Sequence, residues 1–459
     1  MTFSALDSDL TGSLFATEEM RVVFSDHARL AAMLRVEAAL AEAEAAHNRV
    51  PPGLAAAIRR IQASDLDVAA IGRATARAGV PTIPFVNAVE ERLPAKLRGY
   101  FHKAATSQDI LDTALVLQAA EALDRIAVDL DAISTGLARL ARAHRRTPCV
   151  GRTYGQHAAP VTFGYVAAVW LAGVIDVAAE LPDLRRRALT ASLGGPVGTL
   201  AALGDDGAAI VARFARILNL ESPAVAWHVS RARVVRLGAW LATLIGALAK
   251  IAGDVVFLSA TEVGEVAEAP ASGRGGSSSM PHKRNPVSST VILAAHGAAG
   301  GLLASLSGAM AAANQRPAGA WQSEWHALPQ LFGLASGALR EARRIADGLV
   351  VDKARMRANL DLTGGLVFSD AVAARLAPKL GRHAAGALVE AAAATVRQTG
   401  RSFGKALAAD RRIRNALGDD YRVDAEMQAA LAAAAAATDR VLKDAAVTRR
   451  AIATRKRRR

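Results

Sequence analysis

Cysteine is almost absent from this chain, in which Cys149 is the only one among 459 residues. A single cysteine excludes an internal disulfide framework. Because structural disulfides belong to oxidising compartments, a cytoplasmic, reduced setting is the expected one. The first residues also lack the basic and apolar regions of a secretory signal, which favours the same setting.

Long unbroken apolar runs are also missing, although 52% of the residues are hydrophobic. The nearest approach to a membrane span is residues 237–249, which Arg236 and Lys250 bracket. A span needs about 20 consecutive apolar residues. The sequence therefore predicts a buried helix at this place and no membrane partner.

Aromatic residues are scarce, at 4%, whereas positive charge is abundant, with a formal net charge of +14. Three interpretations of this charge compete: a surface that binds nucleic acid, a cleft that gathers a small polyanionic substrate, and a solvated surface without a partner. The shortage of aromatic platforms for bases argues against nucleic acid. The basic run 455–459 is expected to be a disordered tail.

Familiar cofactor motifs are missing too. The chain has no paired cysteines, no His-Glu-x-x-His and no EF-hand loop, so we expect no metal site. It has neither a nucleotide P-loop nor a nicotinamide-binding fingerprint after a strand. No cofactor is expected from these patterns.

Helical periodicity dominates what is present. Residues 26–47 carry apolar side chains at spacings of three and four, Ser25 or Asp26 can cap their start, and Asn48 lies at their end. Similar Ala/Leu/Val stretches follow at 110–145, 160–190, 231–268, 287–313, 327–348, 383–398 and 424–445. The alternation typical of strands is nearly absent. We predict an all-α protein with a bundle of long helices, whose apolar stripes favour a homo-oligomer.

A first polar interruption, HKAATSQD at 102–109, precedes a long apolar stretch. Its Thr, Ser and Asp are typical helix N-caps, and a simple cap is one interpretation. The other is that exposed N–H groups and hydroxyls at a helix N-terminus bind a carboxylate or phosphate. The donors to that anion would be His102, Thr106, Ser107 and Gln108.

Two further interruptions are rich in donors. The segment 151–164, GRTYGQHAAPVTFG, offers several of them within six positions, although a histidine in such surroundings can equally be packed and hydrogen-bonded. Its candidate residues are Arg152, Thr153, Gln156 and His157. In WHVSRAR, Arg231 and Arg233 could bind carboxylates through both guanidinium nitrogens. Surface salt bridges are the alternative for these two arginines.

The segment 275–286, GGSSSMPHKRNP, is the most unusual. Its glycines and serines allow backbone N–H groups to converge on an oxyanion. Lys283 adds a positive charge, Asn285 can both donate and accept, and the flanking prolines stiffen the loop. A plain linker is the alternative, but it would not need these charged and polar residues in its middle.

Three of these segments together resemble the fumarase/aspartase superfamily. GSSSMPHKRNP is similar to the superfamily's signature loop, and TSQD and GRTYGQHAAPVTFG are similar to its two other shared segments. The resemblance covers essentially the whole chain. EVGEVAE, WHVSRAR, AGAWQSEW and MRANLDLTGGL extend it to the bacterial 3-carboxy-cis,cis-muconate cycloisomerases within the superfamily.

The resemblance implies a helical subunit of three domains. These are an N-terminal helical domain at 1–108, a central long-helix bundle at 109–352 that carries the signature loop (residues 270–286), and a C-terminal helical domain with a basic tail at 353–459. It also implies a homotetramer whose active sites are shared between subunits, and chemistry without a metal or other cofactor. The implied reaction moves a proton beside a carboxylate while a C–N or C–O bond forms or breaks one carbon away.

The resemblance also assigns roles. Ser277 corresponds to the serine that transfers the proton, and Ser278 is its positional competitor and a substrate contact. Lys283 and Asn285 would stabilise the dianion formed beside a carboxylate. His157 is the candidate for a second acid/base group or carboxylate ligand.

One departure favours the cycloisomerase branch. Tyr154 stands where the related adenylosuccinate lyases have a histidine that protonates the leaving nitrogen. A carboxylate nucleophile is already ionised and needs no such acid. The expected activity is therefore conversion of the tricarboxylate 3-carboxy-cis,cis-muconate to a carboxymuconolactone, in the protocatechuate branch of aromatic degradation (the beta-ketoadipate pathway). The alternatives are adenylosuccinate lyase or another C–N lyase, and a non-catalytic, anion-binding helical scaffold.

Overall fold

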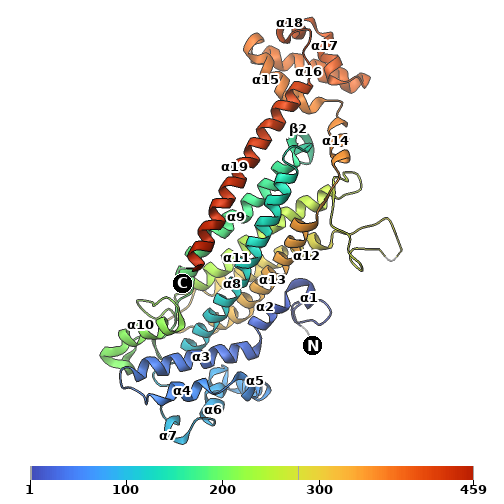
Figure 1. Cartoon of the computed structure of the whole chain (residues 1–459). Helices are drawn as coiled ribbons and strands as arrows, with labels where there is room; N and C mark the ends of the chain where they lie inside the picture. The colour runs from blue at the N-terminus through green and yellow to red at the C-terminus, as the bar shows by residue number, and fades with distance from the viewer. Residues whose placement is uncertain (1–2, 278, 458–459) are drawn as a thin grey trace. The chain divides into compact units, whose positions relative to one another are not determined.

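A computed structural model describes residues 3–277 and 279–457 of the chain, and these residues are predominantly α-helical (Figure 1). The long apolar stretches all form helices, which confirms the predicted all-α class. The longest helices are α8 (Ser107–Ala143), α9 (Phe163–Ala188), α11 (Ala232–Leu258), α12 (Val287–Gly308), α13 (Ala320–Gly348) and α19 (Asp424–Arg457). The predicted buried helix at 237–249 is the middle of α11.

The contacts between residues divide the chain into two compact units. Unit 1 contains Met1–Leu130, Val177–Leu248 and Val291–Arg340, and unit 2 contains Asp131–Asp176, Ala249–Thr290 and Glu341–Arg459. The division into three domains at 108/109 and 352/353 stays a prediction.

Unit 1 is built around α3 (Asp26–Ala45), whose start is capped by Ser25: its Oγ accepts the N–H of Ala28 at 3.2 Å. Apolar side chains of α3 such as Met33 and Leu40 are buried in one continuous core. This core includes side chains of α6 and α10. The remaining short helices of the unit are α1 (Gly12–Phe15), α2 (Glu18–Val23), α4 (Gly53–Arg59), η1 (Ala63–Asp65), α5 (Val68–Ala78), α6 (Thr82–Glu90), α7 (Ala95–Arg98), η2 (Ala201–Asp206) and α10 (Gly207–Leu218).

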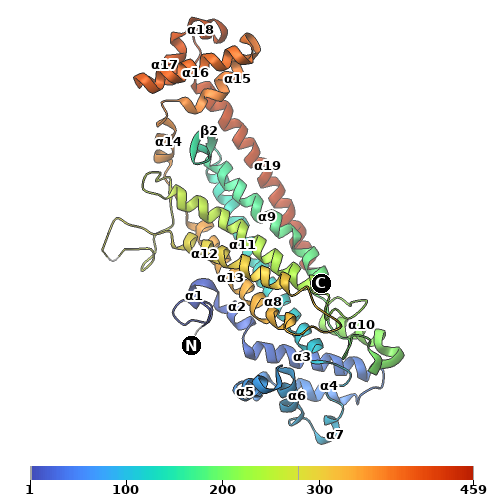
Figure 2. The same cartoon turned by 180° about the vertical axis from the view of Figure 1, so that it is seen from behind.

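Unit 2 holds a second core of buried side chains that includes Phe403 and Val372. Four short helices gather there in both views of the chain (Figure 1 and Figure 2): α15 (Ser369–Leu380), α16 (Arg382–Thr399), α17 (Phe403–Ala409) and α18 (Arg411–Leu417). The unit also contains the short helices α14 (Lys353–Asp361) and η3 (Leu366–Phe368). Two antiparallel strand pairs complete the unit: the hairpin of β1 (Pro148–Thr153) with β2 (Gln156–Thr162), and the short pair of β3 (Val266–Ala267) with β4 (Val350–Val351), whose strands are distant in the sequence.

The C-terminal end corrects one expectation. The run 455–459 was expected to be a disordered tail, but α19 continues to Arg457, and only residues 458–459 lie outside the described chain. Alanine, lysine and arginine are good helix formers, so a basic composition does not end an alanine-rich helix.

Three helices correct another expectation. By length and composition alone, α9, α11 and α12 are long and apolar enough to cross a membrane. The sequence-based prediction missed these helices because it considered only unbroken apolar runs. A helix can carry one or two charged residues and still be apolar enough on average to cross a membrane. The chain itself buries 56%, 50% and 33% of their most apolar stretches, so α12 has the smallest buried share of the three.

Candidate functional site

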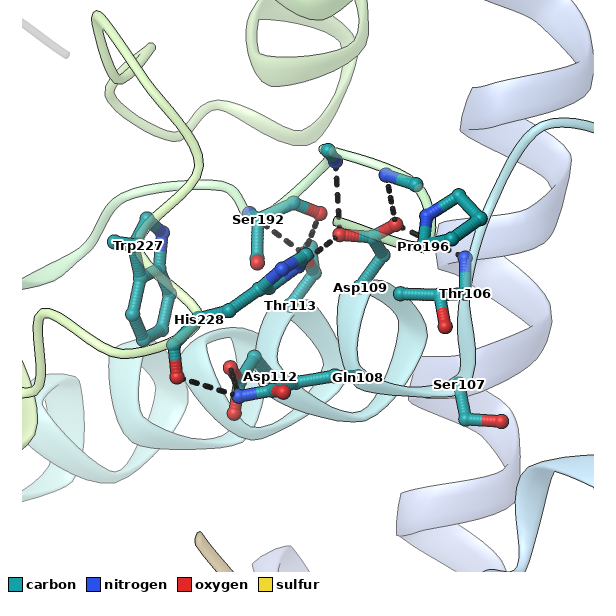
Figure 3. Close-up of polar contacts among 12 residues, drawn as sticks. Thr106, Ser107, Gln108, Asp109, Asp112, Thr113, Ser192, Pro196, Trp227 and His228 are labelled. Carbon is teal, nitrogen blue, oxygen red and sulfur yellow. Dashed lines mark hydrogen bonds and ion pairs between the residues drawn. The ribbon is translucent and has the colours of Figure 1, made fainter. Parts of the chain in front are cut away.

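The N-terminus of α8 carries the first predicted segment. Thr106 lies at the cap position, and its backbone N–H donates to Asp109 Oδ2 at 3.0 Å. This is the reach-back half of a capping box, which satisfies an N–H group that the helix cannot. Thr106 and Ser107 are half-buried, and Figure 3 shows the Ser107 hydroxyl pointing away from the Asp109 carboxylate. Both hydroxyls remain candidates for substrate contact.

Asp109 gathers three further donors (Figure 3). Its Oδ1 accepts the Gly194 N–H at 2.9 Å and lies 2.6 Å from His228 Nε2, while its Oδ2 accepts the Gly195 N–H at 2.9 Å. All of these groups are buried. A β-carbon on Gly194 would lie 2.4 Å from that of Ala226, so only glycine allows this approach. The carboxylate therefore fixes a glycine-rich loop against the start of α8.

Gln108 is engaged inside the protein rather than with a ligand. Its Nε2 donates to the His228 carbonyl at 2.8 Å and to Asp112 Oδ2 at 3.2 Å, and the side chain is fully buried (Figure 3). This corrects the prediction that Gln108 donates to a substrate anion. Sequence spacing shows that Gln108 is near the helix start but not that it occupies an inward position.

Arg231 is likewise a structural group. Its Nη1 and Nη2 donate to Asp112 at 2.7 and 3.0 Å, and its Nε donates to Glu324 at 2.8 Å. All three side chains are 1% exposed. The two carboxylates raise the pKa of Arg231 against the opposing effect of burial. The prediction that Arg231 binds a substrate carboxylate is corrected, because internal carboxylates already use every nitrogen of its guanidinium group.

The Arg233 side chain contacts other residues than Arg231 does. Its Nη1 donates to the Arg187 carbonyl at 2.6 Å and to Thr190 Oγ1 at 3.1 Å. It lines a cavity of about 400 Å³ with Arg186 and Arg236. The pKa of Arg233 is lowered by burial and by the neighbouring Arg236. An anion could be accommodated beside these arginines, so Arg233 stays a predicted ligand.

His102 lies just before α8 and contacts the core of unit 1. Its Nδ1 lies 2.6 Å from Glu37 Oε1 on α3. Burial opposes the charged ring, but the hydrogen bond and the charge of Glu37 outweigh it and raise the pKa of His102. Lys103 beside it is exposed. The start of α8 thus presents two potential cations to a ligand.

In unit 2 the second predicted segment forms the β1–β2 hairpin. Tyr154 and Gly155 make its two-residue turn with φ of 51° and 76°, the positive values that a type I′ turn requires. Thr153 and Gln156 pair across the turn, and both are exposed, as is Tyr154. The hairpin therefore presents three polar side chains at its tip.

Arg152 is paired at the base of this tip. Its Nη1 and Nη2 donate to the two oxygens of Glu265 at 3.0 and 2.5 Å, and Asn359 Nδ2 donates to Glu265 Oε1 at 2.7 Å. The Nε of Arg152 has no partner among the described residues, so it stays a candidate for binding a carboxylate. Burial and the charge of Arg152 lower the pKa of nearby His157, which favours the neutral imidazole.

A pocket of about 410 Å³ opens beside the Arg152–Glu265 pair. Its walls are mainly apolar, and Phe257 lies under the Arg152 guanidinium, 5.5 Å from ring centre to Cζ. Lys250 and Asp254 also line it. Such a mixture of apolar walls and a few polar groups is typical of small-molecule sites.

The signature loop places a hydroxyl among backbone donors. Ser277 Oγ accepts the N–H of Met280 at 3.1 Å and that of Ser279 at 3.4 Å. Two N–H groups directed at this oxygen stabilise negative charge on it. Ser278, the predicted competitor, lies outside the described residues.

Lys283 and Asn285 follow on the returning side of the same loop, and both are exposed. The Asn285 N–H donates to the Gly275 carbonyl at 2.8 Å, and Gly276 pairs with Arg284. This pairing closes the neck of the loop. Ser277 and Lys283 therefore belong to one closed loop, and their roles at an oxyanion stay predictions.

Two acidic side chains anchor the base of the loop, and sequence reasoning did not identify either. Glu268 accepts the N–H groups of Ser288 and Ser289 at the start of α12, at 2.9 and 2.8 Å. Glu341 contacts Arg274 and accepts the Ser288 hydroxyl at 2.9 Å. Glu268 is the last residue of EVGEVAE, one of the segments that carry the resemblance, whereas Glu341 stands among arginines in the sequence, in LREARR, and resembles a solvated residue.

The predicted residues thus fall into two sets, one in each unit. Unit 1 holds His102, Thr106, Ser107, Gln108, Arg231 and Arg233, and unit 2 holds Arg152, Thr153, Gln156, His157, Ser277, Lys283 and Asn285. Among the described residues, no group of three or more His, Cys, Asp or Glu is placed to hold a metal ion.

Comparisons with known proteins define the class. The sequence model of a family described as Lyase matches residues 14–301, and the chain belongs to this family, which is part of the fumarase/aspartase superfamily.

Individual relatives narrow the comparison. A 3-carboxy-cis,cis-muconate cycloisomerase of Pseudomonas putida is 42% identical over 428 residues, 92% of this chain and 99% of that protein. A nitrosuccinate lyase of Streptomyces davaonensis is 42% identical over 418 residues, 88% of each chain. The crystal structure of the 3-carboxy-cis,cis-muconate lactonizing enzyme from Pseudomonas putida aligns with a TM-score of 0.89 and 39% identity, over 96% of this chain and 100% of that one. The resemblance seen in the sequence is confirmed, and the chain is an enzyme of this class.

Proposed function

We propose that this enzyme converts 3-carboxy-cis,cis-muconate to a carboxymuconolactone. The observation that carries the proposal is the exposed Tyr154 at the hairpin turn. An enzyme that releases an amine needs an acid for the leaving nitrogen, and tyrosine is a poor donor at neutral pH. A carboxylate that closes a lactone is already ionised. The similarity to relatives that carry the cycloisomerase name supports the choice of substrate.

The proposed reaction begins with intramolecular attack. One substrate carboxylate oxygen forms a C–O bond to a carbon of the conjugated double bond. The electron pair of that double bond moves to the carbon beside another carboxylate, which becomes a dianion. Lys283 and Asn285 stabilise this charge.

Ser277 then completes the reaction. Its Oγ–H delivers the proton to the carbon beside the carboxylate, and the N–H groups of Ser279 and Met280 stabilise the resulting alkoxide. The alkoxide regains a proton from water, so one solvent proton is consumed for each lactone formed.

The remaining carboxylates of the substrate require cations and donors. We assign this function to His102, Thr106, Ser107, Arg152, Thr153, Gln156 and Arg233, with His157 as a second acid/base group and Ser278 as a further contact. We propose a homotetramer whose sites combine segments of different subunits, as the resemblance to the superfamily implies. We further propose a cytoplasmic enzyme that takes a small tricarboxylate, works without a cofactor and has neither a nucleic-acid nor a membrane partner.

A second candidate substrate is nitrosuccinate, because a relative of that name shares as much identity as the cycloisomerases do. Tyr154 does not separate the two, since a nitrite leaving group also departs as an anion. The decisive experiment is a turnover panel of carboxymuconate, nitrosuccinate and adenylosuccinate at equal concentration. Loss of the ultraviolet absorbance of carboxymuconate is expected, and turnover of only another member of the panel would overturn the proposal.

Two variants connect this activity to the loop. Ser277→Ala is expected to lower kcat about 10²- to 10⁴-fold, because the proton donor is lost. Ser272→Ala, at an exposed serine of the same segment, is the matched control and is expected to keep wild-type kcat. Equal activity of both variants would remove Ser277 from the proposed chemistry.

A further inference from the structure

Two buried carboxylates lie on α3 behind His102. Glu37 and Glu44 are seven residues apart, or two helical turns, and therefore share one face of the helix. Each is 1% exposed. Glu37 Oε1 contacts His102 Nδ1 at 2.6 Å, whereas Glu44 Oε1 has no hydrogen-bond partner among the described residues.

Core packing alone does not explain this pair. The rest of this face is apolar, with residues such as Met33 and Leu40. A buried carboxylate is costly unless it is paired, so replacing an apolar residue by glutamate twice on one face is unfavourable for stability. A pair of buried carboxylates that lowers stability therefore indicates a functional role for their negative charge.

The charged groups around the pair come from three places. Lys103 and His102 precede α8, Asp109 lies on its first turn, and Arg49 follows α3. Arg49 is already engaged, since its Nη2 lies 2.8 Å from Asp206 Oδ2. Burial and the charge of Glu37 raise the pKa of Glu44 to about 8, against the opposing cations.

His102 itself is held in an uncommon conformation. Its φ is +52°, in the left-handed region that non-glycine residues seldom adopt. The contact with Glu37 fixes Nδ1 as a donor, while Nε2 has no partner among the described residues. The ring is half-buried and thus reaches the surface at the start of α8.

We propose that Glu37 is a positioning residue that keeps His102 an imidazolium with Nε2–H free for a substrate carboxylate, and that Glu44, once ionised, extends this state to higher pH. The inference deepens the proposed function and rests on it for the substrate. A negative charge within a few ångströms favours the imidazolium. Ionisation of Glu44 adds a second such charge as the pH rises.

The test follows the His102 ring directly. Histidine labelled with ¹³C at Cε1 is titrated by NMR in the full chain, and His102→Asn identifies the signal. Glu37→Gln is expected to lower the midpoint of His102 by roughly one to three pH units, and Glu44→Gln by a smaller amount. Glu42→Gln, a carboxylate on the same helix that pairs with Arg59 at the surface, is the matched control. An unchanged His102 midpoint in Glu37→Gln would overturn the inference.

A kinetic readout separates positioning from mere stability. The alkaline limb of kcat/KM for carboxymuconate should move to lower pH in Glu37→Gln, with KM raised more than kcat is lowered. A purely structural role would reduce the amount of folded enzyme without moving the limb, and that result would also contradict the inference. If the wild type does not turn over carboxymuconate, the proposed function fails, and the NMR titration still decides the role of Glu37.

Discussion

Tyr154 is the residue on which the proposed choice of lactone formation over amine release depends. It occupies a fully exposed turn with positive φ. If no proton is needed at this place, the phenol is dispensable. Tyr154→Phe is therefore expected to keep kcat/KM for carboxymuconate within about threefold of wild type in a steady-state assay, since loss of a general acid costs about 10²-fold or more. A loss of that larger size would show that the hydroxyl transfers a proton.

Glu44 makes the stability of the fold depend on pH. With its pKa raised from 4.5 to about 8, the folded state binds more protons than the unfolded state between these values. The free energy of unfolding therefore falls as the pH rises through this window, with a slope of up to about 1.4 kcal/mol per pH unit from this group.

Glu44→Gln removes that slope. Urea unfolding is measured at several pH values between 5 and 8. The free energy of unfolding of the variant, relative to that of the wild type, should rise by a few kcal/mol from pH 5 to pH 8. The free energy of unfolding of Glu42→Gln should change with pH as that of the wild type does, because the Glu42 carboxylate is partly solvated. If the free energy of unfolding of Glu44→Gln also changes with pH as that of the wild type does, Glu44 is ionised in the folded state over the whole range from pH 5 to pH 8.

At the scale of helices, Arg231, the residue before α11, connects the start of that helix to α8 and α13 through Asp112 and Glu324. Removing one partner of a buried ion network leaves uncompensated charge, which costs about 3–5 kcal/mol. Arg231→Met should lower the free energy of unfolding by that amount in urea titrations. Arg59→Met, which breaks the exposed pair with Glu42, should cost less than about 1 kcal/mol. Similar losses in both variants would contradict the structural role of Arg231.

The sequence predicts local elements well and distant partners poorly. Ser25 caps α3 as its type suggests, and the long apolar stretches are helices, because both depend on neighbours in the chain. The partner of His228 is Asp109, 119 positions away, and that of Arg152 is Glu265, 113 positions away. Nothing in local spacing identifies such pairs.

The same reason explains which site residues were misassigned. Arg231 and Gln108 are donor types within segments shared by the superfamily, but acidic and carbonyl groups from elsewhere in unit 1 satisfy them. The loop residues Ser277, Lys283 and Asn285 stay predicted site residues, and they were easy to select because the loop is made of consecutive residues. Glu37 was hidden, since a glutamate in an alanine-rich helix looks like a solvated one until its burial is known.

For the whole molecule, the uncovered apolar surface of α9, α11 and α12 is the main feature to explain. A membrane or other subunits could cover it, and the proposed homotetramer requires subunits. Light scattering after size exclusion, without detergent, should give four times the chain mass of 47.7 kDa. A fully active species with the mass of a single chain would contradict shared active sites.

The central claim is that Ser277 protonates carbon while a carboxylate closes a lactone. ¹H NMR of the product formed from 3-carboxy-cis,cis-muconate in D₂O tests it most directly, because the serine hydroxyl exchanges with solvent. The expected product is a carboxymuconolactone with one deuterium on the carbon beside a carboxylate, formed by the wild type and not by Ser277→Ala. Unchanged substrate with the wild type, or a lactone formed equally fast by Ser277→Ala, would contradict it.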